Sequence, residues 1–201
     1  MKQRVFLFDL DSTVTTAEIL PTIAKKIDRE VEMRDLTEKT MMGEIGFVES
    51  FTARVDILKD IDVNDVSRMI SDISLSDKIV NFLKANNSRC YIVTSNLDVW
   101  IDELMQKIGM GDNYFSSSAV VCDNKIQKIN HILRKDEVVS KFKDYEVVAV
   151  GDGSNDRKML ESADISIAYG GVRDVAPVLL EVADYAFYNE DKLCEFLNRL
   201  V

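Results

Sequence analysis

Two pairs of acidic residues carry most of the chemistry that this sequence could perform. The first pair, Asp9 and Asp11, follows a short apolar run, in the segment Asp-Leu-Asp-Ser-Thr at positions 9–13. Side chains alternate along an extended chain, so we expect both carboxylates to point the same way. Adjacent carboxylates repel each other unless a proton, a lysine or a metal ion offsets their charge. The alternative is that these acids only end a strand and cap the next helix.

The second pair, Asp152 and Asp156, lies in the segment Gly-Asp-Gly-Ser-Asn-Asp at positions 151–156. Its glycines allow tight backbone turns. The simpler interpretation is a turn in which Asn155 or Asp156 caps the following helix. If both segments border one crevice, however, four carboxylates meet there and require a cation. Mg²⁺ fits, because it prefers oxygen ligands and often combines one or two carboxylates with substrate phosphate.

Three other residues could hold an anion beside these acids. Ser95 and Asn96 follow an apolar run, and a hydroxyl with free backbone N–H groups at a strand-to-helix turn forms a small anion site. Capping of the next helix by either side chain is the alternative. Lys135 stands just before a predicted helix. It is an ordinary solvated charge unless the crevice needs a fixed positive group.

The elements that must position these residues follow a regular alternation. Short apolar runs predict strands at 5–8, 90–93, 147–150 and 165–168, and helical patterns occupy 78–86, 99–108, 136–142, 156–163 and 191–201. Strand, polar loop and helix in repetition predict an α/β fold with a doubly wound parallel sheet. Ligands of such sheets bind beyond the carboxyl ends of the strands, where the polar segments lie.

Residues 16–76 break this alternation, because they contain no convincing buried strand. They show helical patterns at 17–27, 29–41, 48–58 and 63–73. Such an insertion after the first strand predicts a small helical bundle that caps the active edge of the sheet. We therefore expect an α/β core formed by residues 1–15 and 77–201, with a helical cap formed by residues 16–76.

Composition excludes several classes of function. The 201 residues are 46% hydrophobic and 30% charged, with a formal net charge of −10. So acidic a surface disfavours binding to nucleic acid or to an anionic membrane. Three scattered cysteines and a single histidine fit poorly with a zinc site, a disulfide framework or a Ser-His-Asp triad. The first apolar run is too short for a signal peptide and no segment approaches a membrane span, so we expect a cytoplasmic protein.

Taken together, the motifs resemble those of the haloacid dehalogenase superfamily of phosphohydrolases. Positions 9–13 are similar to its DxDxT motif and positions 151–156 to its GDGxND motif. Ser95 matches its second motif and Lys135 its third, and the helical insertion resembles its C1 cap. Within the superfamily the chain is most similar to the phosphoserine phosphatases. The resemblance implies a Rossmann-like core with an inserted cap.

The resemblance also implies a two-step phosphoryl transfer. Asp9 would attack phosphorus and form an aspartyl phosphate, while Asp11 would protonate the leaving alcohol and then activate water. Mg²⁺ would be held by Asp9, by the backbone carbonyl of Asp11 and by Asp152, with Asp156 in support. The residues implied to bind the phosphoryl oxygens are Ser95, Lys135 and Asn155, together with the N–H of Asn96.

Four cap residues fall at places where phosphoserine phosphatases contact their substrate. Glu18 and Arg54 would hold the amine and the carboxylate, and Met41 and Phe47 would form an apolar lid. The alternative is that the charged pair faces water and the apolar pair packs the bundle. The family usually has two glycines after the second-motif serine, whereas this chain has Asn96-Leu97. We expect the side chain of Asn96 to narrow the pocket.

Our leading hypothesis is an Mg²⁺-dependent phosphomonoester hydrolase that acts on a small phosphorylated metabolite. The favoured substrate is phosphoserine or a similar phospho-amino acid. A phosphotransferase or mutase on the same fold is an alternative, because it shares every core residue. A signalling module that stores phosphate on an aspartate is a third hypothesis. We expect a monomer or a homodimer.

Overall fold

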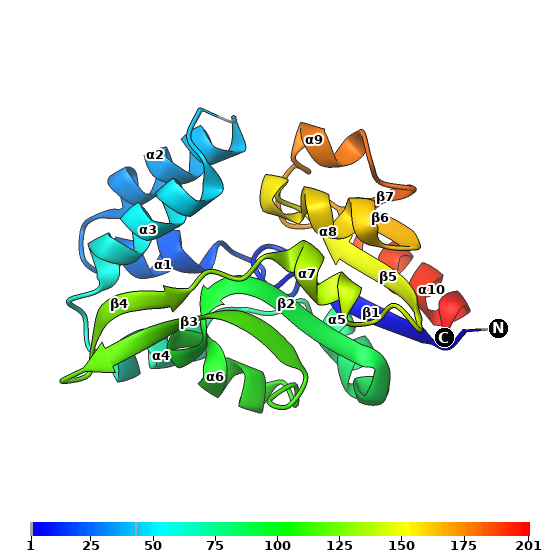
Figure 1. Cartoon of the computed structure of the whole chain (residues 1–201), viewed down its shortest axis with the longest axis horizontal. Coiled ribbons are helices and arrows are strands. Elements are labelled where there is room, and N and C mark those ends of the chain that lie inside the picture. The colour runs from blue at the N-terminus through cyan, green and yellow to red at the C-terminus, as the bar shows by residue number, and fades with distance from the viewer. Residues whose placement is uncertain (1, 43) are drawn as a thin grey trace.

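A seven-stranded sheet forms the centre of the protein (Figure 1). The structure is a computed structural model that describes residues 2–42 and 44–201. Of Met41 it describes the backbone only. All neighbouring strands are parallel except the antiparallel pair β3 and β4. The strand order is β4 (Lys125–His131), β3 (Tyr114–Cys122), β2 (Cys90–Leu97), β1 (Arg4–Phe8), β5 (Glu146–Gly151), β6 (Ile165–Tyr169) and β7 (Tyr185–Phe187).

Strand β1 shows why the apolar runs form central strands. Phe6 and Phe8 pack into the hydrophobic core on one face of the sheet, and Val5 and Leu7 pack into the core on the other face. A strand buried on both faces is continuously apolar, as parallel sheets covered by helices require. The strands predicted at 5–8, 90–93, 147–150 and 165–168 are confirmed. Strands β3, β4 and β7 were not predicted.

Two sets of helices supply these two cores. Helices α5 (Asp77–Ala85), α6 (Asp98–Lys107) and α10 (Glu190–Leu200) contribute Phe82, Leu104 and Leu193 to the first core. Helices α7 (Lys135–Ser140), α8 (Arg157–Ser162) and α9 (Pro177–Leu180) contribute Val138, Met159 and Leu179 to the second. The predicted α/β fold class, a doubly wound and mostly parallel sheet, is therefore confirmed.

The insertion after β1 contains helices α1 (Ile19–Lys25), α2 (Glu30–Met41), α3 (Phe47–Leu58) and α4 (Val63–Ser71). All four predicted helices are present, with ends shifted by two residues at most. Helices α1, α2 and α3 pack on one another and lie opposite α8 and α9 in Figure 1. Helix α4 contacts α1 and packs mainly against α6. The insertion thus contacts the core as well as covering its edge.

The chain leaves and re-enters the core at adjacent points. Thr15 and Leu75 form an isolated antiparallel bridge, the Thr16 N–H donates to the Ser74 carbonyl at 2.9 Å, and the Ser76 N–H donates to the Val14 carbonyl at 2.9 Å. These bonds hold the start and the end of the insertion side by side.

In the described part of the chain we find no helix with the length and apolar character needed to cross a membrane.

Candidate active site

The segment after β1 delivers the first two acids to the carboxyl edge of the sheet. The N–H of Asp9 donates to the carbonyl of Val150 at 2.9 Å, so this residue still follows the ladder between β1 and β5. Ser12 then adopts a left-handed conformation with φ 55°. The N–H groups of Val14 and Thr15 both donate to the carbonyl of Leu10 at 3.0 Å, which closes the turn. The turn therefore begins immediately after Asp9.

The loop after β5 delivers the second pair. Asp152 and Asp156 are fully buried. Oδ2 of Asp156 accepts the N–H groups of Asp152 at 3.1 Å and Gly153 at 2.9 Å, so the loop is folded around this carboxylate. At Gly151 a Cβ atom would lie 2.6 Å from the carboxyl carbon of Asp156, closer than atoms approach in proteins. The sequence needs glycine at this position so that the acid can pack against the backbone.

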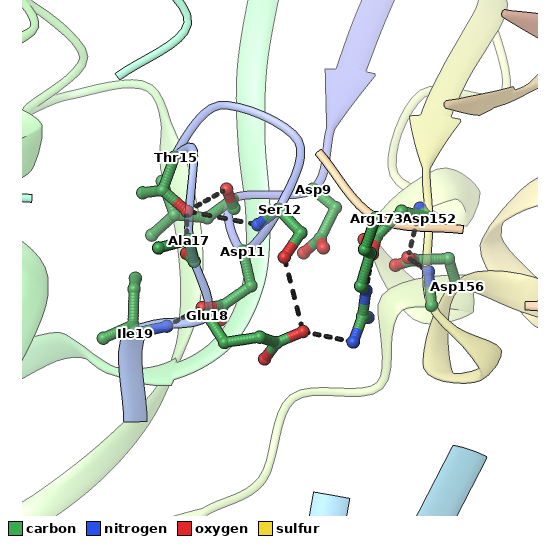
Figure 2. Close-up of polar contacts among 12 residues, drawn as sticks. Asp9, Asp11, Ser12, Thr15, Ala17, Glu18, Ile19, Asp152, Asp156 and Arg173 are labelled. Atoms are coloured by element: carbon green, nitrogen blue, oxygen red, sulfur yellow. Dashed lines mark hydrogen bonds and ion pairs between the residues drawn. The ribbon is translucent and has the colours of Figure 1, made fainter. Parts of the chain in front are cut away.

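Three carboxylates converge where these loops meet. Asp9, Asp152 and Asp156 each place one oxygen within 4.8 Å of the others, and all three residues are buried (Figure 2). Lys135 is buried beside them, contacts Asp9, and donates from Nζ to Asp156 Oδ1 at 2.6 Å. Burial and the nearby charge of Asp156 raise the pKa of Asp9 to about 7, although Lys135 opposes the shift. The cluster has more negative than positive charge.

The cluster has the donor set that a divalent cation requires. Oδ1 of Asp152 is buried without a hydrogen-bond partner in the described structure. A buried carboxylate oxygen without a donor is costly, so a bound cation would stabilise it. Burial also raises the pKa of Asp152 above its usual range, although the nearby guanidinium of Arg173 opposes the shift. Three carboxylate oxygens within 4.8 Å of one another suit a hard cation such as Mg²⁺.

The carboxylate of Asp11 departs from the expectation that it joins this cluster. Its Oδ1 accepts the N–H of Ile19, the first residue of α1, at 2.8 Å, and its Oδ2 accepts the side-chain amide of Asn96. The chain leaves the extended conformation after Asp9, so alternation of side chains no longer applies. A helix N-terminus also attracts a carboxylate through its free N–H groups. Metal binding by the Asp11 backbone carbonyl stays a prediction.

A cavity of about 50 Å³ lies over the acids, between the sheet edge and the insertion. Its lining includes residues predicted from the sequence, both at the sheet edge and in the insertion. These residues are Asp9, Asp11, Glu18, Phe47, Arg54, Ser95, Asn96 and Asn155. The structure thus brings most of the predicted residues to one pocket. The side chain of Met41, predicted to form part of the lid, lies outside the described structure.

The strand end at Asn96 differs from the expected anion site. The backbone N–H of Asn96 donates to Thr94 Oγ1 at 3.1 Å, and its side-chain amide reaches the same oxygen at 3.2 Å as well as Asp11. Its donors are therefore already engaged. Strand β2 continues to Leu97, which is the N-cap of α6, so neither Ser95 nor Asn96 caps that helix.

Arg54 is a buried cation without a carboxylate partner. It lies on α3, lines the cavity, and is 8% exposed. Its Nε donates weakly to the Ser50 carbonyl at 3.4 Å, and no described carboxylate lies within 4.0 Å of it. Burial lowers the pKa of Arg54, while the charges of Glu18 and Asp11 oppose that shift. A guanidinium can form two parallel hydrogen bonds with a carboxylate or a phosphate.

Sequence reasoning missed Arg173, which lies in the loop between β6 and α9. Its Nε contacts Oδ2 of Asp152 and its Nη1 contacts Oε1 of Glu18 (Figure 2). Burial disfavours the guanidinium charge, yet the carboxylates of Asp152 and Glu18 outweigh it and raise the pKa of Arg173. The available signal was position, because this loop follows the strand predicted at 165–168 and therefore ends at the same sheet edge.

Comparison with protein families gives a match over most of the chain. A family model for hydrolases, described as haloacid dehalogenase-like hydrolase, matches residues 3–164.

Individual relatives point the same way. The phosphoserine phosphatase of Archaeoglobus fulgidus is 31% identical over 94% of this chain, although the match covers only 58% of that relative's length. The phosphoserine phosphatase of Methanocaldococcus jannaschii is 29% identical, with 94% of each chain covered.

Two solved structures resemble the whole chain. One, described as a phospho-aspartyl intermediate analogue of phosphoserine phosphatase, has a TM-score of 0.80 at 26% identity and covers 98% of this chain and 99% of its own. The other, a substrate-bound phosphoserine phosphatase complex, has a TM-score of 0.79 at 28% identity, with 99% of each chain covered. These likenesses confirm the resemblance inferred from the motifs and the predicted phosphatase class.

Proposed function

Because the chain belongs to the haloacid dehalogenase-like hydrolases, we propose that it is an Mg²⁺-dependent phosphatase that hydrolyses a small phosphomonoester through a phosphorylated Asp9. The observation that carries the proposal is the convergence of Asp9, Asp152 and Asp156 under a pocket, where Oδ1 of Asp152 is buried without a hydrogen-bond partner among the described residues. Lys135 and Arg173 offset part of the buried negative charge, and a bound cation would compensate the remainder.

In the first step a carboxylate oxygen of Asp9 attacks phosphorus. The O–P bond to Asp9 forms as the bond from phosphorus to the alcohol oxygen breaks, and Asp11 gives that oxygen a proton. Burial and the nearby charge of Glu18 raise the pKa of Asp11 to about 6, which supports a role as acid near neutral pH. The contact with Lys135 offsets the repulsion between Asp9 and the phosphate.

In the second step water hydrolyses the aspartyl phosphate. Asp11, now ionised, accepts a proton from the water whose oxygen attacks phosphorus, and the bond from phosphorus to Asp9 breaks. Free phosphate leaves and Asp9 is regenerated. The hydrogen bonds from Ile19 and Asn96 hold the Asp11 carboxylate during both proton transfers.

We assign cation binding to Asp9, Asp152 and the backbone carbonyl of Asp11, with Asp156 in support. A bound Mg²⁺ neutralises charge on the phosphoryl oxygens and on the carboxylates. The groups that we assign to the phosphoryl oxygens are Ser95, Lys135 and Asn155. Asn96 contributes by holding Asp11, because its own N–H groups are engaged.

The proposed substrate is phosphoserine or a similar phospho-amino acid. Arg54, buried without a carboxylate partner, would receive the substrate carboxylate, and Glu18 in the same cavity would receive the amine. Phe47 lines the cavity and would cover the substrate from α3, with Met41 as the other lid residue. The likeness to a substrate-bound phosphoserine phosphatase supports this assignment.

The division into a core of residues 1–15 and 77–201 and a cap of residues 16–76 is also a proposal. It is supported by the paired crossings at Thr15 and Leu75. The cytoplasmic location and the monomeric or dimeric state stay predictions.

Steady-state phosphate release from a panel of phosphorylated metabolites, with and without Mg²⁺, tests the proposal. We expect hydrolysis that depends on Mg²⁺, and a loss of at least about 1,000-fold in kcat for Asp9→Asn. Asp60→Asn, which changes an exposed acid, is the matched control and should keep full activity. Normal turnover by Asp9→Asn would exclude Asp9 as the nucleophile.

The products separate this proposal from its alternatives. Transfer of phosphate to an added alcohol in preference to water would identify a phosphotransferase. An aspartyl phosphate that persists for minutes, without steady release of phosphate, would identify a signalling module.

A further inference from the structure

Arg173 joins the metal end of the pocket to its cap end. Its Nε contacts Oδ2 of Asp152, which follows β5, and its Nη1 contacts Oε1 of Glu18, which directly precedes α1 (Figure 2). A guanidinium is planar and rigid. Because two different nitrogens of this one group make the contacts, Arg173 fixes the separation and the orientation of both carboxylates.

The surroundings hold this bridge in place. The side chains of Arg173 and Glu18 are only 26% and 24% exposed, so solvent screens their attraction less than that of a surface pair. Gly153 gives the guanidinium room, because a Cβ atom at that position would lie 3.1 Å from Nη2 of Arg173. Ser12 Oγ also donates to Oε1 of Glu18, at 3.3 Å. Both contacts use Oε1, which leaves Oε2 for a donor on a ligand.

The charges along the pocket alternate in sign. Asp152, Arg173 and Glu18 form a series of negative, positive and negative groups, and an ammonium group at Glu18 would extend it. The guanidinium of Arg54, which has no carboxylate partner among the described residues, lines the same cavity and would take a carboxylate. A zwitterion therefore matches both receptors. A substrate with a neutral hydroxyl in place of the amine can donate one hydrogen bond to Glu18 but forms no ion pair with it, so it gains less from the orientation of this carboxylate.

We propose that Arg173 is a positioning residue for substrate selection, which anchors Glu18 to the metal ligand Asp152 and so sets the distance between the phosphate end and the amine end of the pocket. This inference rests on the proposed function and adds a residue and a basis of specificity to it. Its consequence is that Arg173 favours substrates with an α-ammonium group over analogues of the same length that lack one.

The test compares two substrates that differ only at the relevant group, O-phosphoserine and glycerate 3-phosphate, in which a hydroxyl replaces the ammonium. The values of kcat and KM are measured at saturating Mg²⁺ for the wild type, Arg173→Gln and Arg173→Lys. We expect Arg173→Gln to raise KM for phosphoserine about tenfold and to change KM for glycerate 3-phosphate less than about threefold. Arg173→Lys keeps the charge but not the two-nitrogen bridge, so its KM for phosphoserine should fall in between.

A double-mutant cycle with Glu18→Gln separates positioning from general support. If Arg173 acts through Glu18, adding Arg173→Gln to Glu18→Gln causes no further loss of preference for phosphoserine. The Mg²⁺ activation constant is measured in parallel, because weaker metal binding would affect both substrates equally. Arg157→Gln is the matched control: this surface arginine pairs with Glu161 and Glu181, and its loss should leave the ratio of KM values unchanged.

The outcomes distinguish failure of the inference about Arg173 from failure of the proposed function. Two results would overturn the inference but not the proposed function, provided that the wild type hydrolyses phosphoserine. One is an unaltered ratio of KM values for the two substrates in both Arg173 variants. The other is additive losses of preference for phosphoserine in the double-mutant cycle. Preference of the wild type for glycerate 3-phosphate would overturn it as well. Absence of turnover for every phosphomonoester would overturn the proposed function and the inference with it. Circular dichroism checks the fold, and if Arg173→Gln does not fold, Arg173→Lys carries the test with an expected shift of about threefold.

Discussion

Both carboxylate oxygens of Asp11 accept hydrogen bonds. The Ile19 N–H and the Asn96 amide hold its two oxygens, and burial raises its pKa to about 6. A group with a pKa near the working pH can both give and accept a proton at useful rates. Its position at the start of α1 also ties the acid to the insertion. The same bonds that stabilise the helix therefore aim the carboxylate.

Asp11→Asn tests the two proton transfers separately. Asparagine keeps an oxygen for the Ile19 N–H but cannot exchange the catalytic proton, so kcat for an alkyl phosphate should fall by about 100-fold or more. With p-nitrophenyl phosphate the leaving group needs no proton, so phosphorylation should proceed and hydrolysis should stall. Rapid-mixing measurements should then show a burst of about one p-nitrophenolate per protein, which an alkyl phosphate does not give. A variant without a burst and with equal losses for both substrates would contradict the assignment.

Lys135 balances the buried acids, so its removal should destabilise the fold. Lys135→Met leaves Asp9 and Asp156 without their shared cation, and breaking a buried ion pair from one side costs about 3–5 kcal/mol. Urea unfolding in a chelator measures this loss of unfolding free energy. Added Mg²⁺ should recover part of it, because the variant cluster has more uncompensated negative charge. Lys128→Met, at an exposed position on β4, should change stability by less than about 0.5 kcal/mol. Equal stability of the two variants would contradict a balancing role.

At this scale the sequence predicted residue types better than side-chain directions. The motifs nominated Asp9, Asp152 and Asp156, and these three converge. The direction of Asp11 could not be predicted, because it depends on the left-handed turn at Ser12. Arg173 has no local pattern around it, so only the folded sheet shows that it reaches Asp152.

At the scale of elements, the antiparallel hairpin of β3 and β4 forms the edge of the sheet next to α4. Its turn consists of Asp123 and Asn124, with φ values of 50° and 59°. Two central residues with positive φ match the twist of the flanking strands. The Asn124 carbonyl also accepts the Val63 N–H at 2.7 Å, so the turn fixes the start of α4.

Substitutions at Asn124 should therefore change stability in opposite directions. Asn124→Gly removes the steric cost of a left-handed residue and should stabilise the protein by about 0.5 kcal/mol. Asn124→Val places a β-branched residue in that conformation and should destabilise it by about 1–2 kcal/mol. Both variants keep the carbonyl that binds Val63, so that contact serves as an internal control. Midpoints of urea denaturation measure both effects, and equal shifts in one direction would argue against the turn geometry.

The hairpin also shows which elements the sequence could predict. The central strands are buried on both faces, so they appear as continuous apolar runs. Strands β3 and β4 are mostly half-buried or exposed and carry polar side chains, which weakens that pattern. The pair Asp123-Asn124 was the available signal, because both residue types tolerate a positive φ. The helices that were predicted end within two residues of the observed ones, whereas the four-residue helix α9 was not predicted.

At the scale of the whole molecule, the first hydrophobic core buries ionisable side chains in their protonated form. Burial raises the pKa of Cys90 to about 12 and that of Cys194 to about 11. Burial also raises the pKa of Tyr169 to about 12. Each of these groups keeps its proton in the folded state at a pH where the unfolded chain has begun to release it.

Stability should consequently fall on the alkaline side. Above the unfolded pKa of the thiols, about 9, the folded state binds more protons than the unfolded state, so the free energy of unfolding decreases as pH rises. Each such group contributes a slope of up to about 1.4 kcal/mol per pH unit until the folded pKa is reached. Denaturant titrations between pH 8.5 and 10.5 measure the slope. Cys90→Ala should make it shallower at a lower overall stability, whereas an unchanged slope would show that Cys90 does not contribute.

The paired crossings at Thr15 and Leu75 affect which changes in the length of the insertion the protein can tolerate during evolution. Because both ends of the insertion meet at one point, the closure entropy of that loop depends only weakly on how many residues lie between them. Segments of other lengths could replace α2 and α3 without moving β1, whereas the start of α1 must remain because its Ile19 N–H holds Asp11. Two short neighbouring stretches of backbone thus link the remainder of the insertion to the sheet edge that carries Asp9.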